Sequence, residues 1–295
     1  MTSSIVVRGQ PSGIRIDKYI SDYLGILNRN QLKTRNAVIS VNGKKTKYSK
    51  IVRTGDTVEL VYDDEVETGI LPEKTDLDII YEDENVLVLN KQRGVVVHPA
   101  NGHYHITLVQ GIAWYLGSEL NEQNKYRPGI VHRLDKDTSG IIITAKNTRA
   151  LDFLASQFKN KTCRKMYIAV ITGKPKLKKG KIDTFIKRDP NNRKKFRTDK
   201  SEGRRSVTNY SVIRYLKNCT LAALFPRTGR THQLRVHMKS IGHPIFGDPI
   251  YGKPDDSFPL LLHAGKLEIT LPDHNEKSTF RSPLPAIFRK ALKEL

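Results

Sequence analysis

The chain is poor in cysteine and in long apolar runs. Among its 295 residues only Cys163 and Cys219 are cysteines, too few for a disulfide scaffold or a four-ligand zinc site, and this usage suits a reducing cytoplasm. No apolar run approaches the roughly 18–20 residues that a membrane span needs. Residues 1–5 lack the basic and then apolar pattern of a secretory signal. We therefore expect a cytoplasmic protein that does not contact a membrane.

The sequence also lacks the common motifs for binding a nucleotide cofactor or a catalytic zinc ion. Neither Gly-x-x-x-x-Gly-Lys-Ser/Thr nor Gly-x-Gly-x-x-Gly occurs, so a nucleotide cofactor has no recognisable cradle. His232 and His237 are five residues apart, which on a helix is about 140° of rotation, so they do not share a face as zinc-protease histidines do. We interpret both histidines as structural, and we expect neither a cofactor nor a metal site.

Acidic residues are outnumbered. The chain has 51 Lys and Arg against 30 Asp and Glu, a net charge of +21. Residues 159–205 hold 18 of the basic residues and only four acidic ones, a net charge of +14. Such an excess favours a polyanionic partner, most commonly nucleic acid. The alternative is a merely soluble basic protein, and the concentration of charge in one region argues against it.

Residues 129–146 form the most informative stretch. Four polar or charged residues, Asp135 to Thr138, precede Ser139-Gly140, and the apolar run Ile141 to Ile143 follows. The run is typical of a strand covered on both faces. A charged turn before such a strand is a common place for catalytic groups, because a rigid scaffold holds it beside a cleft. An ordinary loop with a solvated ion pair is the alternative.

Three motifs carry a family resemblance. The sequence His-Arg-Leu-Asp-x-x-Thr-Ser-Gly at residues 132–140 resembles the central motif of the RluA-type RNA pseudouridine synthases. Residues 81–84, 90–91 and 97–99 resemble the first motif of that family, and residues 229–237 with 242–248 resemble its third. Gln92 stands where family members commonly have proline, a departure that touches no catalytic group. Three motifs in order are far more specific than any one alone.

The resemblance implies a chemistry and the residues that perform it. Uridine becomes pseudouridine when the bond between uracil N1 and the sugar breaks and the base rejoins through C5, so no redox cofactor or energy source is required. The motif makes Asp135 the catalytic carboxylate, Arg235 its ion-pair partner and Tyr167 the residue that packs on the uracil and takes the C5 proton. Whether Asp135 adds to the sugar or abstracts a proton to give a glycal stays open. We interpret Asp137 as a turn carboxylate.

Substrate-binding residues follow from the same resemblance. Because folded RNA hides the anomeric carbon, the target nucleotide must be flipped out. The motif arginine, Arg133, would fill the vacated gap, and we place its neighbour His132 in the same substrate-binding set. Leu261 or Leu262 would supply the apolar floor under the base.

The pattern along the chain predicts an α+β architecture. The resemblance implies the pseudouridine synthase fold, a mixed and mostly antiparallel sheet around a central cleft, and hairpin-rich patterning agrees with it. We expect helices at residues 108–116, after Asn147 as N-cap, and at 231–241 before Gly242. We expect strands at 77–81, 86–90, 163–171, 206–216, 219–225, 260–264 and 267–271, with basic loops at 174–181 and 187–205.

Residues 1–65 predict a separate small domain. An amphipathic helix is expected over 14–27, a short basic helix over 30–35, and strands at 38–41 and 57–61 with a type I′ turn at Asn42-Gly43. This arrangement resembles an S4-like RNA-binding module, although Asn36-Ala37 departs from the usual glycine. A plain αβ appendage is the alternative. We expect a linker over 66–76 and the catalytic domain over 77–295.

Ten basic residues are candidates for RNA binding through phosphates, which adds affinity without base specificity. They are Arg29, Lys33, Arg35, Lys44, Lys45, Lys178, Lys179, Arg193, Lys194 and Lys195.

These observations predict an RNA pseudouridine synthase, an isomerase. Large-subunit ribosomal RNA is the expected substrate, because of the S4-like module, and transfer RNA is the alternative. Two other readings are an RNA-binding or ribosome-assembly protein with a vestigial cleft and a DNA-binding protein, but no helix-turn-helix or zinc finger is recognisable. We expect RNA as the partner and a monomer, since nothing demands a dimer.

Overall fold

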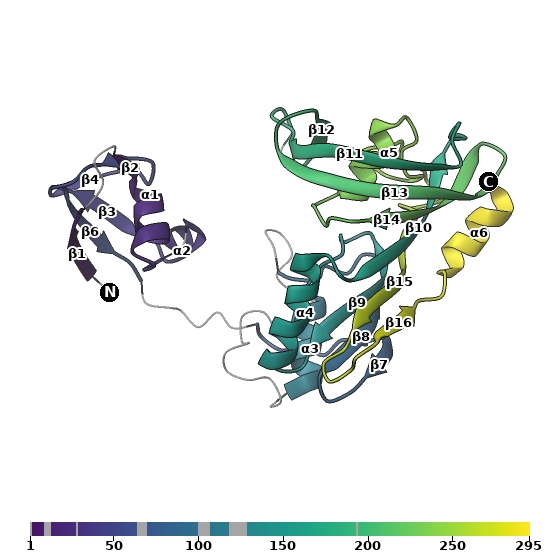
Figure 1. The fold of residues 1–295 in the computed structure, drawn as a ribbon, viewed down its shortest axis with the longest axis horizontal. Coiled ribbons are helices and arrows are strands. Elements are labelled where there is room, and N and C mark those ends of the chain that lie inside the picture. The colour runs from purple at the N-terminus through teal and green to yellow at the C-terminus, as the bar shows by residue number, and fades with distance from the viewer. Residues whose placement is uncertain are drawn as a thin grey trace. The chain divides into compact units, whose positions relative to one another are not determined.

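A computed structural model gives the architecture. It describes residues 2–8, 13–27, 29–63, 70–99, 107–117, 129–192 and 194–295. The chain divides into two compact units, Met1–Thr68 and Gly69–Leu295, and Figure 1 shows the elements of each. No helix in the described ranges is long and apolar enough to cross a membrane.

The first unit is a small antiparallel sheet with helices packed on it. Its strand order is β1-β6-β3-β4, and β2 pairs with β5 in a separate ladder. The strands are β1 (Thr2–Val6), β2 (Ile14–Arg15), β3 (Val38–Val41), β4 (Lys44–Lys45), β5 (Ile51–Val52) and β6 (Thr57–Val61). The helices are α1 (Ile16–Lys18), which continues as the π-helical turn Tyr19–Tyr23, and α2 (Arg29–Thr34).

The predicted turn at Asn42-Gly43 is confirmed, but the first helix is shorter than predicted. Asn42 and Gly43 have φ of 49° and 75° between β3 and β4, as a type I′ turn requires. The first helix spans 16–23, not 14–27, because Ile14 pairs with Val52 and the left-handed φ of Gly25 turns the chain. Leu27 still reaches the same buried core, which explains the helix-like spacing.

A ten-stranded sheet dominates the second unit, in the order β12-β11-β13-β14-β10-β15-β9-β8-β7, with β16 paired to β15. Of the strand pairs in the described ranges, only β15–β9 is parallel. The strands are β7 (Ile79–Glu82), β8 (Val86–Lys91), β9 (Ser139–Ala145), β10 (Arg164–Thr172), β11 (Lys179–Arg188), β12 (Phe196–Asp199), β13 (Arg204–Tyr215), β14 (Cys219–Pro226), β15 (Leu262–Thr270) and β16 (Lys277–Arg281). The expected mixed, mostly antiparallel sheet is confirmed.

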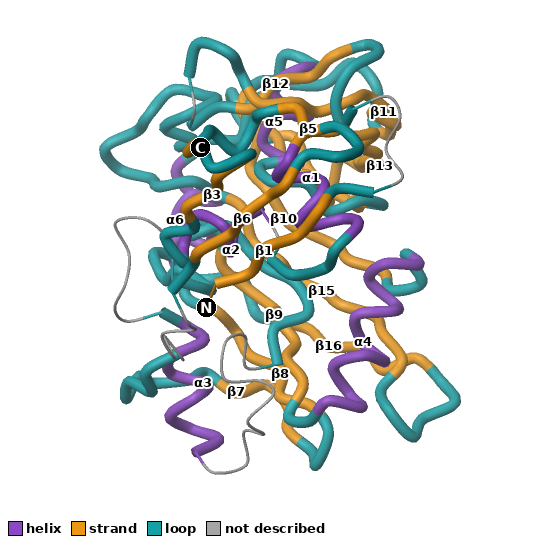
Figure 2. The backbone as a smooth tube through the Cα atoms, turned by 90° about the vertical axis from the view of Figure 1, so that its left-hand side faces the viewer, coloured by secondary structure: helices purple, strands orange, loops and turns teal. Residues whose placement is uncertain are grey.

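Helices α3 (Leu108–Leu116) and α4 (Thr148–Asn160) cover opposite faces of β8 and β9 (Figure 2). Ile141 and Ile143 pack with Leu154 on the α4 face, whereas Ile142 packs with Ile112 on the α3 face. The apolar run is therefore covered on both faces, as predicted. The Asn147 side chain accepts a hydrogen bond from the Ala150 N–H and caps α4.

Helices α5 (Gln233–Ser240) and α6 (Ala286–Glu294) cover opposite faces of the other half of the sheet. Leu234 of α5 belongs to a core that includes Ala169 of β10. Phe288 of α6 packs in another core with Val170, the next residue of the same strand. Strands β10 and β15 thus run from the α5 half of the sheet to the α4 half (Figure 1).

The prediction of basic loops is wrong for 11 of the 27 residues that it covers, because these residues lie in strands. Lys179–Arg188 is strand β11, Phe196–Asp199 is β12, and β13 begins at Arg204. Ile182 and Ile186 of β11 are buried. The charged residues of this segment therefore belong to a strand that also has a buried apolar side. The two expected strands at 260–264 and 267–271 are one continuous strand, β15. Strands β1 and β16 and helix α6 were not predicted.

Candidate active site

Asp135 lies on the loop that leads into β9, and a buried lysine holds this loop in place. The ammonium group of Lys91 donates hydrogen bonds to the carbonyls of Gln92, Val95 and Lys136. Lys91 is 2% exposed, and burial lowers its pKa to about 8. The Thr138 N–H closes the turn on the Asp135 carbonyl. Lys91, the last residue of β8, therefore holds the backbone of the loop that carries Asp135, the catalytic carboxylate expected from the sequence.

Arg235 of α5 approaches Asp135 from the opposite side. Its Nη1 lies 3.7 Å from Asp135 Oδ2, and the rest of the guanidinium forms two 2.8 Å hydrogen bonds with Asp248. Arg235 is 3% exposed and Asp248 is fully buried. Despite its burial, the pKa of Asp248 is lowered, because the guanidinium stabilises the charged form. The buried pair presents the remaining guanidinium edge to Asp135.

A cleft of about 460 Å³ opens between this loop and α5. Its wall includes Tyr167, Leu262, Asp135 and Arg235. Of the lining residues in the described part of the chain, Asp135 is the only carboxylate, whereas seven are Lys or Arg. Those seven are Arg133, Lys159, Lys161, Lys165, Arg227, Arg230 and Arg235. The cleft can therefore take an anionic ligand and present one carboxylate to it.

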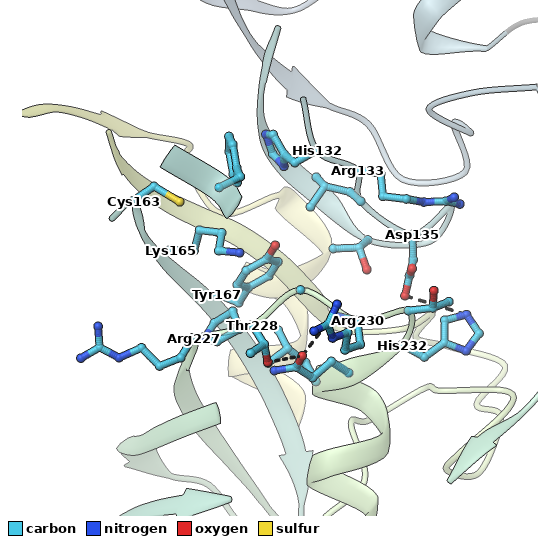
Figure 3. A pocket seen from close by; sticks show the side chains of 18 of the residues that line it. His132, Arg133, Asp135, Cys163, Lys165, Tyr167, Arg227, Thr228, Arg230 and His232 are labelled. Atoms are coloured by element: carbon cyan, nitrogen blue, oxygen red, sulfur yellow. Dashed lines mark hydrogen bonds and ion pairs between the residues drawn. The ribbon is translucent and has the colours of Figure 1, made fainter. Parts of the chain in front are cut away.

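Strand β10 supplies the apolar and aromatic side of the cleft. Lys165 and Tyr167, two residues apart, both point into it (Figure 3). Burial, and in second place the charge of Asp135, raises the pKa of Tyr167, so the phenol is neutral at pH 7. Leu262 lines the cleft, but Leu261 does not. Leu261 packs with Phe288 on the α6 face, since successive residues of a strand face opposite ways.

His132 and Arg133 precede Asp135 on the same loop and also line the cleft. The Ile143 N–H donates to His132 Nε2 over 3.1 Å, and the imidazole stacks on Phe158 with ring centroids 4.5 Å apart. Burial lowers the pKa of His132 to about 3, so the ring is neutral. Its polar contact ties the loop to β9. Arg133 is exposed and lies beside Asp135 (Figure 3).

Comparisons with known proteins show the family of this chain. A family model described as RNA pseudouridylate synthase matches residues 85–240. Ribosomal large subunit pseudouridine synthase D of Borreliella burgdorferi is 43% identical to the chain over 289 residues, which cover 94% of this chain and 88% of that protein. The chain belongs to the RNA pseudouridine synthase family. The resemblance read from the three motifs is confirmed.

Two further relatives agree. An uncharacterized RNA pseudouridine synthase of Bacillus subtilis, YlyB, is 40% identical over 285 residues and covers 95% of this chain and 94% of that protein. The solved structure of human RNA pseudouridylate synthase domain containing 1 matches with a TM-score of 0.59 and 26% identity, over 75% of this chain and 96% of that one. The larger unit therefore has the pseudouridine synthase fold.

The sequence analysis missed several residues that line this cleft or hold its side chains in place. His232, interpreted as merely structural, lines the cleft with its Nε2 4.0 Å from Asp135 Oδ2. Lys165 lies 5.8 Å from the centre of the Phe158 ring, and burial lowers its pKa. Asp248 and Tyr251 lie within the third motif and its continuation, but a single sequence does not show that they contact Arg235 and His232.

The ten candidate RNA-binding residues lie outside the cleft, as far as the structure describes them. Six of them are exposed, namely Lys33, Lys44, Lys45, Lys178, Lys179 and Lys194. Two are half-buried, namely Arg35 and Lys195. Arg35 lies over the ring of Tyr62 at 5.9 Å. Arg29 begins α2, but its side chain and the whole of Arg193 are outside the described residues.

Proposed function

We propose that this chain isomerises uridine to pseudouridine in large-subunit ribosomal RNA, with Asp135 as the catalytic carboxylate. The observation that carries the proposal is the single carboxylate in a cationic cleft, 3.7 Å from an arginine that a second, buried carboxylate holds in place. A carboxylate so placed can act on the sugar of a bound nucleotide while the basic wall takes the phosphates.

The reaction moves one glycosidic bond. The N1–C1′ bond breaks, the uracil turns, C5 bonds to C1′, and the C5 proton leaves while N1 gains a proton. Positive charge develops at C1′ during cleavage, and an ionised carboxylate stabilises it. Asp135 then either adds to C1′ or removes a sugar proton to give a glycal. Both routes use Asp135 as a carboxylate, and the Arg235 guanidinium lies 3.7 Å from it.

Tyr167 and Leu262 would hold the base. A neutral phenol beside a leucine gives the uracil an aromatic and an apolar contact. Because burial raises the pKa of Tyr167, the phenol can take the C5 proton only if it releases its own proton in the same step. Arg133, which is exposed beside Asp135, would enter the gap that the flipped nucleotide leaves.

The name of the Borreliella relative supports ribosomal RNA as the substrate. Transfer RNA is the alternative. The test is to incubate the protein with unmodified large-subunit ribosomal RNA and, separately, with a pool of unmodified transfer RNAs, and to map pseudouridine in each by chemical probing. Stoichiometric modification at discrete ribosomal uridines is expected. Modification of transfer RNA alone would contradict the substrate, and modification of neither would contradict the activity.

The first unit would deliver the protein to RNA. Its small sheet, its helices and the exposed Lys33, Lys44 and Lys45 support the reading of residues 1–65 as an S4-like RNA-binding module, joined by a linker over 66–76 to the catalytic domain over 77–295. A ribosomal substrate would be met in the cytoplasm. One copy of the cleft contains all the proposed catalytic residues, which supports action as a monomer.

A further inference from the structure

His232 adopts a left-handed backbone conformation, which is uncommon for residues other than glycine. Its φ of 55° and ψ of 16° are left-handed, directly before α5. Such a conformation strains a residue that has a β-carbon, and it persists where the surrounding structure holds it, often at functional sites. The His232 ring lies edge-on to Phe196 and to Tyr251, with centroids 5.7 and 5.5 Å away. Its side chain is 17% exposed and lines the cleft.

Two hydrogen bonds fix where the His232 proton lies. The Phe196 N–H, which can only donate, donates to the Tyr251 hydroxyl oxygen over 2.9 Å. The same oxygen lies 2.8 Å from His232 Nδ1. Tyr251 is 4% exposed, and within the described residues Nδ1 is the one acceptor in reach of its hydroxyl proton. Tyr251 therefore donates to Nδ1, and the neutral imidazole carries its proton on Nε2.

That Nε2–H faces the catalytic carboxylate. His232 Nε2 lies 4.0 Å from Asp135 Oδ2 (Figure 3). Arg235 Nη1 lies 3.7 Å from the same oxygen. Both separations are too long for hydrogen bonds, as is common in active sites without substrate, where such bonds tighten on binding. Burial lowers the pKa of His232, which keeps the ring neutral and its tautomer under the control of Tyr251. With the other tautomer, a lone pair would face the carboxylate.

Building on the proposed function, we propose that His232 is a positioning residue whose Nε2–H donates to Asp135 Oδ2 when RNA fills the cleft, and that Tyr251 sets the tautomer this requires. Arg235 and His232 then hold one carboxylate oxygen from two directions. The second oxygen of Asp135 stays directed at the sugar, so the role of His232 is to orient the carboxylate rather than to transfer a proton.

The left-handed backbone makes asparagine and glutamine an informative pair of substitutions. His232→Asn keeps the backbone conformation, which asparagine tolerates well, but its short amide replaces Nδ1 and not Nε2. His232→Gln extends an amide N–H to the Nε2 position. Tyr251→Phe leaves the ring in place and removes the hydroxyl. His274→Asn, at an exposed histidine, is the control.

Single-turnover rates with enzyme in excess over ribosomal RNA, together with Kd from filter binding, test the proposal. His232→Asn is expected to slow turnover about tenfold or more, the equivalent of about 1.4 kcal/mol of transition-state stabilisation, with Kd within about twofold. His232→Gln should recover most of the loss, and Tyr251→Phe should be intermediate. An unchanged rate in His232→Asn, or no rescue by glutamine, would overturn the positioning role.

A measurement without RNA separates this inference from the proposed function. In protein labelled with ¹⁵N-histidine, the nitrogen shifts of His232 report its tautomer. We expect the Nε2–H form in the wild type and a mixture in Tyr251→Phe. A wild-type Nδ1–H form would overturn the proposal even if the enzyme were active on ribosomal RNA. Failure of the wild type to modify RNA would contradict the proposed function, while the tautomer measurement would still test the hydrogen-bond chain.

Discussion

The guanidinium of Arg235 lies between two carboxylates of unequal burial. Asp248 is fully buried and takes two of its hydrogen bonds, whereas the Asp135 side chain is 22% exposed and 3.7 Å away. A buried pair rarely adds net stability, but loss of one member leaves an uncompensated charge. The pair with Asp248 therefore fixes the arginine, and Asp135 receives a partner whose position is set before RNA binds.

Asp248→Asn should be strongly destabilising for this reason. The expected loss is about 3–5 kcal/mol of unfolding free energy, measured by urea denaturation at pH 7. The matched control is Asp183→Asn, because Asp183 also forms two hydrogen bonds with an arginine, Arg205, but at the surface. Solvent screens that pair, so the control should leave the unfolding free energy almost unchanged. Equal losses in the two variants would contradict the account.

His237 should make stability depend on pH. It is fully buried between the hydroxyls of Thr208 and Thr184, and burial lowers its pKa to about 4. The unfolded chain takes up the histidine proton near pH 6.5 while the folded chain does not. The contribution of neutral His237 is therefore complete above pH 6.5 and is lost as the pH falls towards 4.

Between pH 7 and 5.5 this loss amounts to about 1 kcal/mol. Urea denaturation at both pH values, for wild type and His237→Gln, measures it, and the variant should lose that much less on acidification. His274→Gln, at an exposed site, should follow the wild type. A His237→Gln variant with wild-type pH dependence would show that His237 titrates equally in both states.

Some contacts of single residues could be predicted from sequence and others could not. The motif resemblance led to Asp135, Tyr167 and Arg235, and the structure brings all three to one cleft. The spacing between His232 and His237 argued against a metal site, but it could not show that His232 lies near Asp135. The choice between Leu261 and Leu262 depended on which face each presents, and that is set by the register of β15 on β10.

At the scale of elements, β9 and β15 approach each other closely at Gly140. Gly140 has φ of 111°, and a β-carbon there would lie 2.3 Å from the Ala264 carbonyl oxygen. This is the parallel junction, with Gly140 opposite Ala264, that joins the Asp135 loop to the strand carrying Leu262. Glycine is therefore required by both conformation and space.

The unfolding free energies of Gly140→Ala and Gly94→Ala should separate the cost of the backbone conformation from the cost of the missing space. Gly94 also has positive φ, 87°, but a β-carbon there meets nothing within 4 Å. We expect Gly94→Ala to cost about 1 kcal/mol from conformation alone. Gly140→Ala should cost about 1–3 kcal/mol more, because backbone must move apart. Thermal and urea denaturation of both proteins measure the difference, and similar losses would contradict a tight β9–β15 junction.

Apolar patterns located α3 and β9 well but made the first helix too long, and a high density of charge hid β11. Helix α3 has the predicted bounds, and the buried run of β9 was recognised from its composition. Strand β11 was missed, although Ile182 and Ile186 keep a strand's alternation, because its lysines and arginines suggested a loop. Strand β16 was not predicted, although Phe280 is its buried residue. Short edge strands with one buried residue carry too weak a pattern.

At the scale of the whole molecule, the net charge divides between residues 1–65 and the rest of the chain roughly in proportion to length. Residues 1–65 hold 11 basic and seven acidic residues, a net charge of +4 out of +21. Most of the electrostatic attraction to RNA therefore belongs to the catalytic unit, and the first unit would contribute through shape and specific contacts. The boundary between the compact units follows Thr68, inside the expected linker.

Removal of residues 1–65 should consequently reduce selectivity more than chemistry. At saturating RNA the single-turnover rate should stay within a few fold of the full chain, while Kd for the natural ribosomal site rises and modification spreads to other uridines. Filter binding and site mapping of the same samples measure both effects. If the truncated protein modified its natural site as selectively as the full chain, the proposed module would have no role in recognition.

Release of tritium from uracil C5 shows directly whether Asp135 performs the isomerisation. Ribosomal RNA labelled at C5 is incubated with wild type, Asp135→Asn and Asp137→Asn, the last being a matched control two residues away that does not line the cleft. Wild type and Asp137→Asn should release tritium, while Asp135→Asn should release none and should bind RNA within a few fold of wild type. Tritium release by Asp135→Asn at the wild-type rate would contradict the mechanism.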